Sequence, residues 1–152
     1  MPVRHTDQEI AAFLAERKVL PSNYLLAIQP KAKSGHKESE LDVKGADGNQ
    51  FRIVIRLNLK NLLDFSVILG VLPLGSNTLF RLRRYNGKSH EHTNKLEGVK
   101  FYDFHIHTAT ERYQMLGAKE ESFAEPCSRY SAYSSALKCM LIYCSPLVRD
   151  CG

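Results

Sequence analysis

The sequence lacks every short motif by which the common enzyme classes are recognised. It contains no P-loop, no nucleophile elbow and no zincin helix. Its cysteines match neither a Cys-x-x-Cys zinc pattern nor an evenly spaced disulfide framework, and no secretory signal precedes them. We therefore expect reduced thiols in a cytoplasmic protein. These cysteines all lie in the last quarter of the chain: Cys127, Cys139, Cys144 and Cys151.

Long apolar runs are also missing. The longest, at 65–74, is interrupted by Ser66, Gly70 and Pro73 and is much shorter than the roughly 20 residues of a membrane-spanning helix. We expect no membrane partner. The 152 residues, 43% of them hydrophobic, suffice for one core and predict one domain spanning 1–152. The net charge of +5 favours an acidic partner such as nucleic acid without proving one.

Patterns along the chain predict an α+β fold. Thr6 and Glu9 have the spacing of a capping box, which predicts an N-terminal helix. Residues 132–144 have helical apolar spacing, with Cys139 and Cys144 as packing residues, and 144–152 should be a loose tail. We expect a single α+β domain with a mainly antiparallel sheet and the two terminal helices packed on one face. The predicted strands are 23–29, 38–44, 51–59, 65–72, 78–85 and 100–108.

The stretch 78–114 contains the side chains with the clearest catalytic or ligand-binding potential. It holds two His-x-His pairs, His90/His92 and His105/His107. Period two places His105 and His107 on the face of their strand that also carries Phe101 and Asp103, opposite Tyr102, Phe104 and Ile106. On 78–85 it places Arg81, Arg83 and Tyr85 opposite Phe80 and Leu82. If the apolar sides share a core, the paired histidines and arginines are neighbours on the other side, whereas the course of the loop around His90 and His92 cannot be predicted.

Three functional interpretations compete with a purely structural role for these histidines. A metal-independent ribonuclease needs a base, an acid and cations for the phosphate, and His and Arg fit these tasks. Alternate histidines on a strand can instead chelate a metal, although cysteine and carboxylate ligands are scarce. The third interpretation is binding alone, with cations on phosphates and tyrosines on bases.

A family resemblance favours the first interpretation. The succession Arg84-Tyr85-Asn86, the histidine-bearing loop, the His-x-His strand and Glu125-Pro126 before a helix resembles the TumE-like family of small bacterial toxins, over about half the chain. The run HTATERYQ also resembles small bacterial and phage-borne proteins. The resemblance implies a toxin that acts on RNA and a cognate antitoxin protein as partner.

The function expected from the sequence is therefore a toxin-like ribonuclease that needs no cofactor, with His105 and His107 as general base and acid. The rival expectation is a non-enzymatic inhibitor, for instance phage-borne, that uses the same basic face. The residues expected to contact RNA are Arg52, Arg56, Arg81, Arg83, Arg84, Tyr85, His90, His92, Arg112 and Tyr113.

Overall fold

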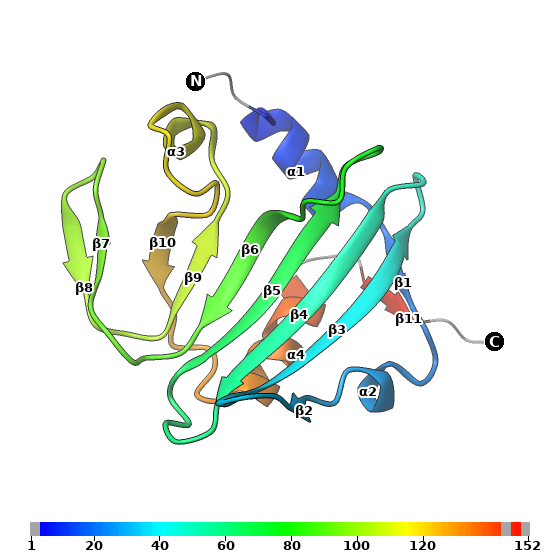
Figure 1. The fold of residues 1–152 in the computed structure, drawn as a ribbon. Helices are drawn as coiled ribbons and strands as arrows, with labels where there is room; N and C mark the ends of the chain where they lie inside the picture. Colours follow the sequence, from blue (N-terminus) through cyan, green and yellow to red (C-terminus); the bar gives the residue numbers. More distant parts are fainter. Residues whose placement is uncertain (1–3, 144–146, 150–152) are drawn as a thin grey trace.

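The strand-like segments lie side by side in a computed structural model that describes residues 4–143 and 147–149. The sheet has the order β10-β9-β6-β5-β4-β3-β1-β11, with β2 beside β3, while β7 and β8 form a separate hairpin (Figure 1). Its described strand pairs are antiparallel apart from β1–β11, which confirms the α+β expectation. In chain order the elements are α1 Asp7–Ala15, β1 Lys18–Leu20, α2 Tyr24–Ala27, β2 Lys31–Ala32, β3 His36–Gly45, β4 Gln50–Asn58, β5 Phe65–Leu72, β6 Phe80–Asn86, β7 His92–Asn94, β8 Val99–Phe101, β9 His105–Thr108, α3 Glu111–Met115, β10 Phe123–Pro126, α4 Tyr133–Tyr143 and β11 Leu147–Arg149.

The first helix begins and ends on side-chain caps. The Thr6 hydroxyl accepts from the backbone N–H of Glu9, whose carboxylate accepts from the N–H of Thr6, so the expected capping box is confirmed. At the other end the ammonium of Lys18 is fully buried. It donates to the carbonyl oxygens of Phe13, Leu14 and Glu16 at 2.8–3.1 Å, which supplies partners to carbonyls that a helix end leaves unpaired.

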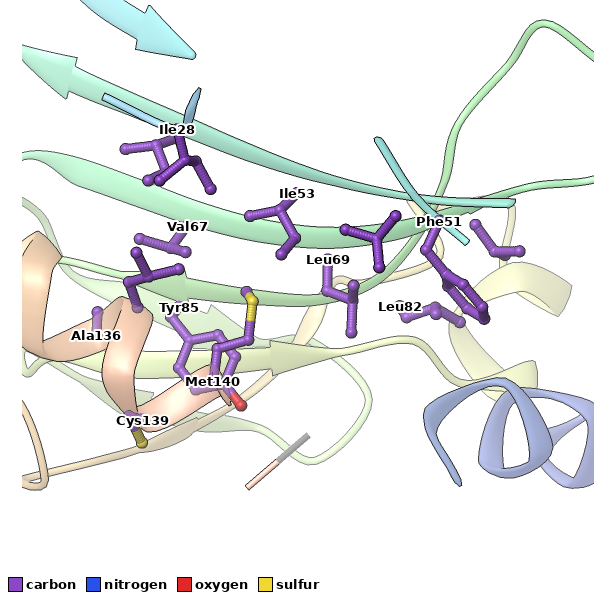
Figure 2. Packing of buried hydrophobic residues seen from close by; sticks show 14 of the residues in the cluster. Ile28, Phe51, Ile53, Val67, Leu69, Leu82, Tyr85, Ala136, Cys139 and Met140 are labelled. Atoms are coloured by element: carbon purple, nitrogen blue, oxygen red, sulfur yellow. The ribbon is translucent and has the colours of Figure 1, made fainter. Parts of the chain in front are cut away.

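Both terminal helices pack on the same face of the sheet. Ile10 of α1 belongs to one buried cluster with Met140 of α4, Ile53 of β4 and Leu69 of β5. Figure 2 shows Met140, Ile53 and Leu69 packed together in this cluster. Cys139 is buried in this packing, as expected, whereas Cys144 lies outside the described residues. Apolar side chains are thus buried on one face of the sheet, and the opposite face is available for polar groups.

The strand β6 contains an irregularity that changes which side chains share a face. Its pairing with β5 shifts between Leu69 and Gly70, so that Arg83 pairs with Leu69 and Tyr85 with Val67, both on the core face. Tyr85 is fully buried in the core. The prediction that Arg83 and Tyr85 lie on the histidine face is therefore wrong, because a bulge adds a residue to one strand and resets the alternation.

Two predicted strands are also wrong in part. Residues 24–27 form the short helix α2, and Tyr24 and Ile28, four residues apart, both enter the core. The segment 100–108 is two strands, since β8 turns away to pair with β7 while β9 continues the main sheet. Within the expected loose tail, β11 pairs in parallel with β1. No helix among the described residues is long and apolar enough to cross a bilayer.

Candidate functional site: a histidine cluster beside Arg84

Three histidines from two different sheets meet on the face opposite the core. His105 and His107 alternate along β9, where they pair with Asn86 and Arg84 of β6. His92 begins β7. The ring centroids of the three imidazoles lie 4.8–5.4 Å apart, and one ring nitrogen of each lies within 4.8 Å of one on each of the others. The expected pair on the strand is therefore joined by a third histidine from the hairpin.

Hydrogen bonds fix the tautomer of each ring. Nδ1 of His105 lies 2.7 Å from the carbonyl oxygen of Asp103, and Nδ1 of His107 lies 2.8 Å from that of Glu121. A carbonyl oxygen only accepts, so both Nδ1 atoms carry the proton and both Nε2 atoms keep a lone pair. The Nε2 of His105 is buried and has no hydrogen-bond partner among the described residues.

Asn94 holds the ring of His92 and also pairs with the backbone of the outer strand β10. Its Nδ2 donates to the carbonyl oxygen of Ala124 at 2.7 Å, and its Oδ1 accepts from the N–H of Ala124 at 2.9 Å. This pairing identifies which amide atom is the oxygen. Because Nε2 of His92 lies 2.8 Å from that same Oδ1, it must donate, and Nδ1 of His92 keeps the lone pair. Each ring therefore has one nitrogen held by an oxygen and one with a lone pair.

Burial keeps the two strand histidines neutral. The hairpin and neighbouring loops leave 0% of His105 and 3% of His107 exposed. Burial lowers the pKa of His105 to about 4 and that of His107 to about 2, and nearby cationic groups, Arg84 among them, add to both shifts. A neutral imidazole accepts a proton or binds a metal, and it cannot act as a proton donor until it is protonated. At neutral pH the two rings can thus ligate a metal or act as weak bases, and neither is available as a general acid.

Arg84 places a cation beside the cluster. It pairs with His107 across β6 and β9, and its side chain is 24% exposed. Burial lowers the pKa of the guanidinium, but an arginine remains charged at neutral pH. Its Nη1 lies 3.9 Å from Oε2 of Glu121, a fully buried carboxylate that makes a closer contact of 2.9 Å with Nε of Arg81. Two arginines therefore share this one carboxylate, and Arg84 has the more distant contact.

The cluster opens into a pocket of about 430 Å³. His92 and His107 line it together with Arg84 and the exposed His90. Most of the remaining lining groups are small and polar, which suits a hydrophilic substrate. They are Asp64, Phe65, Ser66, Asn86, Gly87, Ser89, Thr93, Lys95, Tyr113, Ala118 and Ser122.

Of the remaining residues expected to bind RNA, Tyr113 also lines this pocket but is buried, and the others lie outside it. Tyr85 is in the core, and Tyr113 is 1% exposed with its hydroxyl donating to Glu97, so neither ring offers a face for base stacking. Arg112 pairs with the same Glu97 at 2.7 Å. Arg52 and Arg56 form ion pairs with carboxylates of β3 at 2.8–2.9 Å. The strand face that was expected to be basic therefore lies beside negative side chains that offset its charge.

Sequence reasoning missed the residues that hold the cluster in place. Asn94 and Glu121 carried no motif, and Asp103, which was expected on the same face as the histidines, contacts His105 through its backbone carbonyl. The spacing His92-x-Asn94 in a strand places both side chains on one side and could have signalled the pairing.

No protein-family model, curated protein or solved structure matches this chain. The fold and the site therefore stand on the chain's own residues, and the resemblance to TumE-like toxins remains an expectation.

Proposed function

We propose that the chain acts on RNA at the histidine pocket, as a toxin-like protein that cleaves the phosphodiester backbone. The observation that carries the proposal is the position of Arg84, which pairs with His107 of the histidine cluster and lines the same polar pocket as His92 and His107. Phosphodiester cleavage needs a cation for the phosphate oxygens and a group that activates the attacking oxygen. The pocket contains both kinds of group.

The roles follow from position. Arg84 neutralises a phosphate in the pocket, where Lys95 adds a second cation. The neutral His105 and His107 belong to the activating cluster, and the exposed His90, which also lines the pocket, would give a proton to the leaving oxygen. Toxicity of this kind requires a cognate antitoxin as partner, which would cover or distort the pocket.

The test compares neighbouring arginines on opposite faces of β6. Arg84→Gln removes the cation beside the cluster, whereas Arg83→Gln changes a side chain on the core face that does not line the pocket. Each variant is induced in a bacterial host, with growth and RNA integrity measured, and is incubated in purified form with a labelled single-stranded RNA.

We expect wild type and Arg83→Gln to cleave RNA and arrest growth, and Arg84→Gln to do neither. The double variant His105→Ala/His107→Ala should also be inactive. Equal cleavage by all four proteins, or by none, contradicts the proposal. Salt-sensitive RNA binding without cleavage would instead favour the non-enzymatic binding protein.

A further inference from the structure

We infer that His92, His105 and His107 form a binding site for one divalent transition metal ion, with Zn²⁺ as the reference ion. The inference goes beyond the proposed function, because metal binding can be measured in the absence of RNA. It also revises the expectation of a metal-independent enzyme. Its basis is the pairing of a compact donor set with a complete outer shell of hydrogen bonds.

The donor set is that of a transition metal. Among the described residues, the group contains three imidazoles and no carboxylate or thiolate. Imidazole nitrogens suit Zn²⁺, Cu²⁺, Ni²⁺ and Fe²⁺, whereas Mg²⁺ and Ca²⁺ prefer oxygen ligands. Three protein ligands leave a fourth tetrahedral position, and catalytic zinc sites keep such a position for water or substrate. Here that position would face the pocket beside Arg84.

The outer shell is already in place on every ring. A metal-bound histidine characteristically donates its other N–H to a carbonyl, an amide oxygen or a carboxylate, which fixes the ring and raises its basicity. Asn94 accepts from His92, and backbone carbonyls accept from His105 and His107. Three adjacent histidines that share this arrangement are difficult to explain by packing alone, since packing does not require every ring to be oriented through one nitrogen.

The unpartnered nitrogen of His105 is the second observation. His105 is fully buried, and its Nε2 has no hydrogen-bond partner among the described residues. Leaving such a buried acceptor unpaired is unfavourable, because it has lost its hydrogen bond to water and gained none in return. A metal ion at the centre of the cluster would satisfy it together with the lone pairs of the other two rings.

The geometry requires a modest closure. Tetrahedral Zn²⁺ with Zn–N distances of about 2.0–2.1 Å places its ligand nitrogens roughly 3.3 Å apart. The nitrogens span up to 4.8 Å, so the rings must approach one another by up to about 1.5 Å. His105 and His107 are fixed on the main sheet. His92 lies on β7 of the separate β7–β8 hairpin and is half-buried, so small shifts of that hairpin together with Asn94 would bring its ring closer to the other two.

The experiment uses full-length protein without a histidine tag, purified without chelators and then loaded with Zn²⁺ or Co²⁺. His92→Ala removes a ligand from the hairpin without touching the buried strand. His36→Ala is the matched control, a partly exposed histidine at the start of β3 that is outside the group and outside the pocket. Metal content after gel filtration, competition with a chromogenic chelator and the visible absorption of Co²⁺ are measured for all three proteins, and circular dichroism checks that each is folded.

We expect one Zn²⁺ per chain in wild type and in His36→Ala, with a tetrahedral Co²⁺ spectrum. His92→Ala should lose affinity by more than the roughly 10–100-fold that loss of an outer-shell partner costs. Zn²⁺ should raise the melting temperature of wild type and not that of His92→Ala. The inference is overturned if wild type binds neither ion, or if the two variants bind equally.

The two proposals fail separately. Metal binding without RNA cleavage would refute the proposed function and leave the metal site standing. RNA cleavage by a wild-type protein that binds neither Zn²⁺ nor Co²⁺ would do the reverse.

Discussion

Asn94 links the stability of the fold to the candidate site, so its replacement tests both. The side chain is 4% exposed. Its amide replaces a neighbouring strand at the free edge of β10, where it pairs with the N–H and the C=O of Ala124 while also accepting from His92. Asn94→Ala removes all three hydrogen bonds at once.

The magnitude follows from the groups left behind. Ala124 is fully buried, so its N–H and C=O would both lose a partner in Asn94→Ala. Each unpaired buried group costs about 1–3 kcal/mol, and partial relaxation or entry of water lowers the sum. We expect the free energy of unfolding to fall by about 2–4 kcal/mol. The chain has no tryptophan, so urea unfolding is followed by far-ultraviolet circular dichroism.

A second substitution separates the two roles of Asn94. In Asn94→Asp, the carboxylate still accepts from the N–H groups of His92 and Ala124 but cannot donate to the carbonyl of Ala124. It should therefore be destabilised at least as much as Asn94→Ala yet keep its affinity for Zn²⁺, because a carboxylate is an ordinary partner for a metal-bound histidine. Asn94→Ala should lose about 10–100-fold in affinity.

The control is Thr93→Ala, an exposed neighbour on the same strand, which should change stability by no more than about 0.5 kcal/mol. The reasoning is refuted if Asn94→Ala changes the stability as little as this control. It is equally refuted if the two Asn94 variants bind Zn²⁺ with the same affinity.

Two further predictions concern buried polar groups. Lys18→Met should lower the free energy of unfolding, measured in urea, by about 3 kcal/mol, because carbonyls at the end of α1 lose a charged donor. The control Lys44→Met changes an exposed lysine and should have little effect. Equal effects at the two positions would disprove the capping role. Tyr130→Phe should cost about 1–3 kcal/mol in a thermal or urea melt, because the hydroxyl of Tyr130 lies within 2.8 Å of the carbonyl oxygens of Asn86 and His105 and serves both. A melt unchanged from wild type would show that water replaces the hydroxyl.

Local patterns predicted most of the sheet. The alternation around Phe51, Ile53 and Ile55 produced β4 as expected, since one buried face imposes a period of two. The run that became β5 was also expected as a strand. The capping box located α1 because its two hydrogen bonds join residues three apart in sequence. Structural features that depend on contacts between residues close in sequence are the ones that can be predicted from the sequence.

The errors arise where tertiary contacts decide. A four-residue apolar segment fits strand or helix alike, and only the joint burial of Tyr24 and Ile28, one helical turn apart, indicates α2. The bulge that turns Tyr85 into the core depends on how β6 meets β5, and the alternation of 78–85 contains no sign of it. For the site, His105 and His107 were assigned to the correct face, but the approach of His92 depends on the docking of a hairpin.

Docking of the β7–β8 hairpin completes the candidate site. His105 and His107 are held by the main sheet, whereas His92 reaches them only when the β7–β8 hairpin lies against β10 through Asn94. A ligand that contacts both parts binds the docked state and not the undocked one, so it stabilises docking by RT ln(1 + [L]/Kd). At a concentration 100 times its Kd, a metal ion would add about 2.7 kcal/mol to the docked hairpin. Because Lys95 and Thr93 of the same hairpin line the pocket, closing the metal site would also shape the wall against which a substrate phosphate lies.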